Sequence, residues 1–228
     1  MVCNLVYDMH GENIPINKIQ QSLFEESVAA DHNDYGMLRK HANENFEDKI
    51  EKENIEPQKF AEILIERQGH KASCKDFLPT QNFFEKIKKE SIAGYNSALI
   101  AAVGSNDVSS LRELHQSGGI MHASNKFGES VLHMACRRGH TETVRFLISE
   151  AKVSLRIRDD FGRTILHDAF WCSQPNSFIV EMILDQEPDL LMFKDKRGNA
   201  PLEYVKREHW YTWNNFLVER QQKLLPRI

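Results

Sequence analysis

The second half of the chain repeats itself every 33–36 residues, and this period constrains the fold more than any other feature. The segment FGESVLHMACRRGHTETVRFLISE at 127–150 aligns with FGRTILHDAFWCSQPNSFIVEMIL, which begins 34 residues later. Leucines at 99, 132, 166 and 202 are spaced by 33, 34 and 36 residues, and glycines at 128, 162 and 198 by 34 and 36. Such a period is typical of solenoids whose units contain a turn and two short helices.

Each repeat carries the residue types that a turn followed by two helices requires. Glycine at the turn adopts positive φ without steric cost. Asp159 and Asp195 precede two of these glycines by three residues and are placed to accept hydrogen bonds from the turn amides. Gly139 is expected to end a first helix in the left-handed conformation. The expected apolar face of the following helix consists of Val144, Phe146, Leu147 and Ile148.

These residues resemble the ankyrin repeat family, whose pattern runs Asp-x-x-Gly-x-Thr-Pro-Leu-His-x-Ala, then Gly-His, then Val-x-x-Leu-Leu. GESVLHMACRRGHTETVRFLI matches it closely, and GRTILHDAF matches it over the first helix. RGNAPLEYV keeps Gly198, Pro201 and Leu202 but has Glu203 in the histidine position. NSALIAAVGSNDVSSLREL lacks both the glycine and the histidine. The resemblance covers about residues 92–220 and implies an all-α solenoid of about four units, with the degenerate outer two as caps.

We therefore expect an ankyrin-type repeat domain over 92–228, with units at about 92–125, 126–159, 160–195 and 196–228. In the third unit, Pro175 predicts a longer loop at 172–176 between the two helices, since proline breaks a helix interior. In the last unit, a helix is expected to cap the stack, and its side chains Trp210, Trp213 and Phe216 are expected to pack into the core.

Residues 1–91 are expected to form a separate acidic, mostly helical region that is disordered in part. They carry 12 basic and 17 acidic residues, a net charge of −5. The expected apolar helix faces are Ile16, Ile19, Leu23, Phe24 and Val28 after Pro15; Phe60, Ile63 and Leu64 after Pro57, with Gly69 as the stop; and Phe83, Phe84 and Ile87 after a Thr80 cap. The charged stretch ANENFEDKIEKENIEP between the first two is expected to be solvated.

The whole chain carries a formal net charge of −4, which gives no overall attraction to nucleic acid or anionic lipid. The N-terminus lacks the basic and apolar segments of a secretory signal, and no apolar run is long enough to span a membrane. Four cysteines, none in a Cys-x-x-Cys pair, are typical of reduced thiols. We expect a monomer of the cytoplasm or nucleus that binds no nucleic acid, membrane or cofactor.

The repeated histidines, His133 and His167, raise the question of chemistry. His133, Cys136 and His140 are of types that bind zinc, but Gly139 should end the helix before His140. In the family that the chain resembles, such histidines are structural and bond backbone groups of the neighbouring turn. The resemblance therefore favours braces over a metal site. It assigns structural roles to Gly128, His133, Gly139, Gly162, His167 and Gly198.

A hydrolase interpretation would need His167, Asp168 and Ser173 to act together. The chain has neither a Gly-x-Ser-x-Gly elbow nor a glycine-rich phosphate loop. We therefore predict no enzyme activity. The alternative that stays open is a regulatory subunit or an enzyme with an unrecognised active site within 1–91.

The resemblance implies a protein-binding module or adaptor whose partner binds the concave face, made of turn tips and first helices. Arginines cluster in the two central units, which predicts either a solvated face or a patch for an acidic protein partner. Phe127 and Phe161 either contact the partner or pack against each other. By alignment, the variable positions of the concave face are Lys126, Phe127, Glu129, Arg137, Arg138, Asp160, Phe161, Arg163, Trp171, Lys196, Arg197, Asn199 and Arg207.

Overall fold

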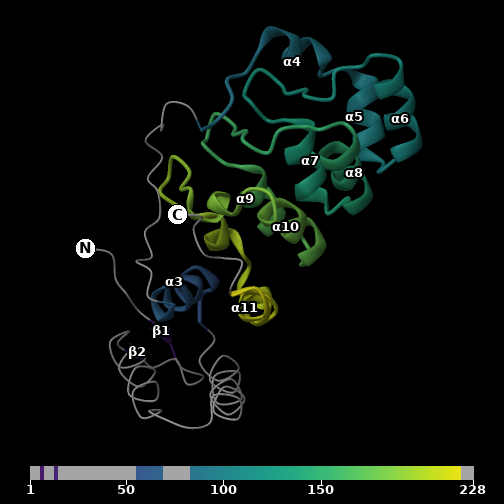
Figure 1. Cartoon of the computed structure of the whole chain (residues 1–228). Coiled ribbons are helices and arrows are strands. Elements are labelled where there is room, and N and C mark those ends of the chain that lie inside the picture. Colours follow the sequence, from purple (N-terminus) through teal and green to yellow (C-terminus); the bar gives the residue numbers. More distant parts are fainter. Residues whose placement is uncertain (1–5, 8–12, 15–54, 69–82, 222–228) are drawn as a thin grey trace. The chain divides into compact units, whose positions relative to one another are not determined.

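A computed structural model describes residues 6–7, 13–14, 55–68 and 83–221 (Figure 1). The chain divides into two compact units. Of the described residues, 55–68 and 207–221 belong to the smaller unit, and 83–206 belong to the larger unit. The repeat pattern predicted a boundary near residue 92 and assigned 207–221 to the last repeat. The predicted helix after Pro15, the charged stretch up to residue 54, and the expected stop at Gly69 lie outside the described residues.

In the smaller unit, two helices pack together. Helix α3 (Pro57–Arg67) has the predicted proline at its first position and buries Phe60, Ile63 and Leu64. Helix α11 (Trp210–Glu219) contacts α3 and buries Trp213, whose ring meets that of Phe216 edge to face. The side-chain amide of Asn214 donates to the carbonyl of Ile55 over 2.8 Å.

The same unit contains two short strands, β1 (Val6–Tyr7) and β2 (Asn13–Ile14). They pair antiparallel, with Val6 opposite Ile14. These strands were not predicted, because residues 1–91 were expected to be mostly helical. The rest of the regular structure in the described residues is helical.

The larger unit is a stack of short helix pairs (Figure 1). The first pair is α5 (Ser97–Gly104) and α6 (Val108–Gln116). The second is α7 (Val131–Arg138) and α8 (Thr141–Arg145), which continues as the π-helical turn η1 (Phe146–Glu150). The third is α9 (Ile165–Phe170) and α10 (Ser177–Leu184), followed by the 3₁₀ turn η2 (Pro188–Met192). The larger unit ends with the 3₁₀ turn η3 (Pro201–Tyr204). The following turn η4 (Arg207–His209) belongs to the smaller unit, as does α11.

The helices form two layers, which is how each unit buries an apolar face that it cannot cover alone. First helices contact first helices along α5, α7, α9 and η3, and the second helices α8 and α10 contact each other. The side chains predicted to form the apolar face of the second helix of unit two are all buried, as are Leu99, Leu132, Leu166 and Leu202 of the repeat. The predicted loop at 172–176 lies between α9 and α10.

The turns before the first helices have the predicted geometry. Gly128, Gly162 and Gly198 have φ values of 79°, 80° and 87°. The Asp159 carboxylate accepts hydrogen bonds from the amides of Phe161 and Arg163, and that of Asp195 bonds its own turn equivalently. Asn125 fills this position in the second unit and bonds the amides of Phe127 and Glu129, which the sequence analysis did not predict.

Consecutive turn tips are also joined to each other. The amide of Asp160 donates to the carbonyl of Phe127 over 2.8 Å, and the amide of Lys196 donates to the carbonyl of Phe161 over the same distance. The three tips therefore lie side by side and present their side chains along one edge of the stack.

Residues 83–91 lie against the repeats, and this segment corrects one prediction. The expected helix carrying Phe83, Phe84 and Ile87 is wrong: residues 83–88 are not helical, and helix α4 begins at Lys89 and ends at Gly94. Both phenylalanine rings contact Phe193, at 4.7 and 4.9 Å between centroids. The guanidinium groups of Arg156 and Arg158 stand over the same rings.

Two backbone bonds hold this segment to the repeats, one from the Glu85 amide to the Arg156 carbonyl and one from the Ser124 amide to the Ser91 carbonyl. Residues 83–91 therefore pack as part of the larger unit, although the predicted boundary at 91/92 assigned them to the N-terminal region.

Candidate protein-binding surface

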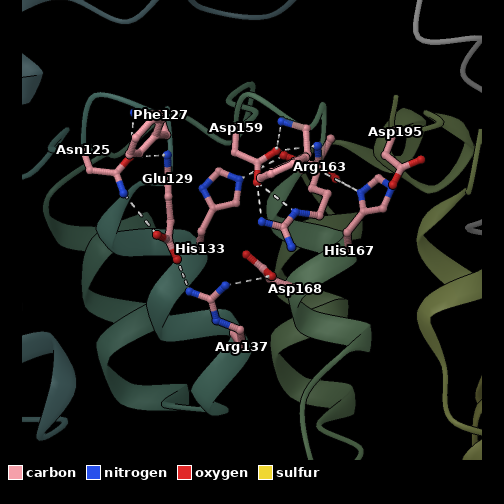
Figure 2. A network of polar contacts seen from close by, with 12 residues as sticks. Asn125, Phe127, Glu129, His133, Arg137, Asp159, Arg163, His167, Asp168 and Asp195 are labelled. Carbon is pink, nitrogen blue, oxygen red and sulfur yellow. Dashed lines mark hydrogen bonds and ion pairs between the residues drawn. The ribbon is translucent and has the colours of Figure 1, made fainter. Parts of the chain in front are cut away.

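The two repeated histidines link one unit to the next (Figure 2). The Nδ1 atom of His133 lies 3.2 Å from the amide nitrogen and 2.8 Å from the hydroxyl of Ser130, which caps α7. Its Nε2 atom lies 3.1 Å from the carbonyl oxygen of Arg163 in the next turn. His167 repeats this geometry, with Nδ1 against Thr164 and Nε2 at 3.2 Å from the carbonyl of Asn199. This is the arrangement that the brace hypothesis requires.

The partners of these rings fix their protonation state. An amide N–H only donates, so Nδ1 of each ring accepts; a carbonyl only accepts, so Nε2 carries the proton. A doubly protonated ring would lose the Nδ1 acceptor and place a charge in the core. Burial lowers the pKa of His167 from 6.5 to about 4, which favours the neutral ring.

The residues considered as zinc ligands, namely His133, Cys136 and His140, are not brought together as a metal site. Both ring nitrogens of His133 are occupied, and Nδ1 of His140 bonds the carbonyl of Val103 at 2.9 Å, beyond the left-handed Gly139 (φ 69°). Cys136 is a buried free thiol whose pKa burial raises well above its ordinary value. In the part of the chain that the structure describes, no group of three or more histidine, cysteine or acidic residues is placed to hold a metal ion.

The residues that a hydrolase interpretation would need, namely His167, Asp168 and Ser173, are not arranged for catalysis. Both nitrogens of His167 bond backbone or capping groups, so neither is left to take a proton from Ser173. Asp168 is buried on α9, and both of its carboxylate oxygens lack a hydrogen-bond partner. Burial raises the pKa of this carboxyl group.

Arg137 lies between two carboxylates of adjacent units (Figure 2). Its guanidinium bonds the Glu129 carboxylate, and its Nη1 atom lies 3.6 Å from Oδ1 of Asp168. Arg138 donates to the carbonyl of Gly104 over 2.9 Å, which ties α7 to the first unit. These arginines, predicted as partner-binding residues, therefore also make contacts between repeats.

None of the residues predicted for the partner-binding face is buried. Phe127 and Phe161 occupy equivalent tip positions, and each is 54% exposed. Among the described residues, the two rings make no contact with each other; Lys126 stands over Phe127 at 4.9 Å and Arg163 over Phe161 at 5.2 Å. Trp171, at the end of α9, is 45% exposed. The alternative that the two phenylalanines pack tip to tip is wrong.

The tips of the third and fourth units border a groove with a volume of about 340 Å³. Five of its lining residues were predicted from the sequence, namely Phe161, Arg163, Trp171, Arg197 and Asn199. Asp195, Glu203 and Tyr204 complete it. Tyr204 was missed because the fourth unit departs from the repeat pattern, so alignment gave no reason to place this side chain beside Trp171, 5.6 Å away between centroids.

Arg207, which was predicted for this face, and Cys172, which follows Trp171 in the sequence, do not line the groove. Cys172 is buried, and its Sγ atom lies against Gly139. Arg207 is exposed but belongs to the smaller unit, where its guanidinium stands over the ring of Trp210 at 5.8 Å.

Stacked helix pairs, hydrogen-bonded turn tips and inter-unit histidines define the larger unit as a helical repeat solenoid. Residues 98–204 match the family described as ankyrin repeats, in three copies, and this part of the chain is a stack of ankyrin repeats. Such repeats are in general protein-interaction modules and are not themselves catalytic.

The relatives that the chain resembles are much longer proteins of different kinds. The mitochondrial liver isoform of glutaminase from Mus musculus is 32% identical over 111 residues, which are 49% of this chain and 18% of the relative. Diacylglycerol kinase zeta from Rattus norvegicus is 31% identical over 125 residues, 54% of this chain and 13% of the relative. The human SMC5-SMC6 complex localization factor protein 1 is 32% identical over 81 residues, 36% of this chain and 8% of the relative.

The chain therefore spans less than a fifth of each of these relatives. Two of them are named as enzymes and one as a localization factor, and nothing in these partial matches shows an enzyme activity for this chain. Among the helices that the structure describes, none combines the length and apolar character that crossing a membrane requires.

Proposed function

We propose that this chain is a protein-interaction module or adaptor that binds a protein partner through the concave face of its ankyrin stack. The observation that carries the proposal is the equivalent exposure of Phe127 and Phe161 on adjacent, hydrogen-bonded tips. Two phenylalanines thus recur at equivalent exposed positions of a rigid frame, close to arginines, and aromatic and arginine residues are typical of interface hot spots.

The charges of the same face support a protein partner. Lys126, Lys196 and Arg197 are exposed at the tips, with Arg163 half-buried between them. Within this proposal the chain acts as a monomer in the cytoplasm or nucleus, with no cofactor, nucleic acid or membrane. The rival location for an active site, residues 1–91, lies mostly outside the described residues, and no observation favours it.

Site-specific photo-cross-linking tests the proposal. A photoreactive phenylalanine analogue replaces Phe127 or Phe161 in the full chain, and replaces Phe178 as the control, because Phe178 is 68% exposed on the second helix α10. We expect one protein to be captured from positions 127 and 161 and not from 178. Equal capture from all three positions, or capture from 178 alone, would contradict the proposal.

A further inference from the structure

The groove between the third and fourth tips has three aromatic rings among its lining residues. Phe161 lies on one tip, Trp171 at the end of α9 and Tyr204 at the end of η3. The volume of about 340 Å³ lies at the lower end of the roughly 300–1,000 Å³ range of pockets that hold compact ligands. One bulky apolar side chain of a partner fits this description, and an extended stretch of chain does not.

A cation is disfavoured in this groove because Arg163 already stands over its rings. The guanidinium carbon of Arg163 lies 5.2 Å from the centre of the Phe161 ring and 5.7 Å from that of Trp171. A second positive charge would meet a like charge at the faces that attract cations. The groove is therefore unsuited to a lysine or arginine side chain of the partner.

The arginines of the groove retain donors for an anion. Arg163 uses Nε and Nη2 to bond the Asp159 carboxylate, and its Nη1 atom finds no hydrogen-bond acceptor among the described residues. The exposed Arg197 side chain likewise makes no hydrogen bond or ion pair within the described part of the chain. Both groups can donate to a carboxylate at the mouth of the groove.

The carboxylates that line the groove are engaged within the fold. Asp195 accepts from two turn amides and from the hydroxyl of Tyr204, 2.6 Å away, and is buried. Burial and this hydrogen bond raise the pKa of Tyr204, so its hydroxyl stays protonated and donates to Asp195. Glu203 accepts from the amide of Ala200 and takes the place of the brace histidine. Glu203 is an exposed negative charge that partly offsets Arg197.

We infer that this groove is the specificity pocket of the binding face and takes one bulky apolar side chain that is flanked by carboxylates, from an acidic segment of a protein partner. The inference rests on the proposed function and names the chemistry of its partner. The apolar side chain packs against the adjoining rings of Trp171 and Tyr204, and a neighbouring carboxylate bonds Arg197 and Nη1 of Arg163.

A random-peptide library displayed on phage and selected on the full-length chain tests this inference. We expect selected peptides to be enriched in aspartate or glutamate next to an aromatic or large aliphatic residue. Trp171→Ala should weaken such a peptide by at least about thirtyfold, the loss typical of a hot spot, and Arg197→Ala by about tenfold. Circular dichroism checks that each variant keeps its fold. The matched control is Arg145→Ala, because Arg145 is an exposed arginine on the other helix layer, at the end of α8.

Enrichment of basic peptides, no enrichment at all, or an equal loss with Arg197→Ala and Arg145→Ala would overturn the inference. Photo-cross-linking at Phe127 and Phe161 separates this failure from that of the proposed function. If a partner is captured at the tips but Trp171→Ala and Arg197→Ala leave its affinity unchanged, the concave face binds and the groove does not. If capture does not depend on the tips, the proposed function itself fails.

Discussion

The Nε2 atom of His133 lies 3.1 Å from the carbonyl oxygen of Arg163, a residue of the next repeat. The same bond recurs one unit later, from His167 to Asn199. Each imidazole thus caps its own helix through Nδ1 and satisfies a carbonyl of the following turn through Nε2. Because that turn also carries the exposed tip side chains, the buried histidines hold in place the surface that we propose as the binding face.

Removing either imidazole should lower stability by a similar amount. His133→Ala and His167→Ala each leave buried backbone groups without a partner, at a cost of about 1–3 kcal/mol. Urea unfolding midpoints measure this, with His115→Ala as a control because His115 is exposed. A variant whose midpoint matches that of the unaltered protein would show that its histidine is not a brace.

Acid should remove the contribution of His167. Its pKa in the folded protein is lowered to about 4 from 6.5 by burial, so its stabilising effect is complete above pH 6.5 and lost as the pH falls toward 4. The full loss is roughly 3 kcal/mol, from the difference between these pKa values. The stability gap between the unaltered protein and His167→Ala should therefore shrink across this range. A gap that is constant with pH contradicts the assigned shift.

Asp168 should be a net cost that Arg137 reduces. Burial raises the pKa of Asp168, so ionisation disfavours the folded state at neutral pH, and this penalty is relieved as the pH falls. The equivalent position in the preceding repeat is Met134, which is buried. We expect Asp168→Met to stabilise by on the order of 1 kcal/mol, since apolar replacements of buried ionic groups are often favourable.

In the same experiment, Arg137→Ala should destabilise by about 1–2 kcal/mol, because it leaves a buried carboxylate without its counter-charge. This loss should largely disappear when Asp168→Met is already present. Calorimetric melts of the four proteins complete the double-mutant cycle. Additive effects of the two substitutions would show that the 3.6 Å approach of these side chains has no energetic consequence.

The segment before α4 should contribute to the stability of the repeats. The half-buried ring of Phe84 contacts Phe193 and Arg158, so Phe84→Ala should cost about 1–2 kcal/mol, less than a fully buried ring. Lys86→Ala is the matched control, since Lys86 is exposed on the same segment. If the thermal melts of the two full-length variants are identical, this segment does not stabilise the repeats and is a separate appendage.

The repeat pattern predicted the turns and helix ends well because these features are local. A glycine with positive φ or an aspartate three residues before it acts through neighbouring atoms, so Gly128 and Asp195 could be interpreted from spacing alone. The exposed tips, Phe127 and Phe161, followed from the same alignment. Whether these two rings touch depends on the stacking of the units, which the sequence does not specify.

The errors arose where distant contacts decide the conformation. Phe83, Phe84 and Ile87 together have helical spacing. The packing partner of the two phenylalanines, Phe193, is distant in the sequence, and the observed segment is not helical. The groove residue Tyr204 was missed for a related reason, since its place beside Trp171 comes from the 3₁₀ turn that replaces the first helix in the fourth unit.

We propose a division of roles in which buried histidines hold the stack together and exposed aromatic side chains bind the partner. The most direct test measures both the urea midpoint and the affinity for the cross-linked partner in His133→Ala and Phe161→Ala. We predict that His133→Ala loses about 1–3 kcal/mol of stability and keeps its affinity at temperatures where it stays folded. We predict that Phe161→Ala keeps its midpoint and loses at least about tenfold in affinity. Normal stability with lost binding in His133→Ala, or unchanged affinity in Phe161→Ala, would contradict the account.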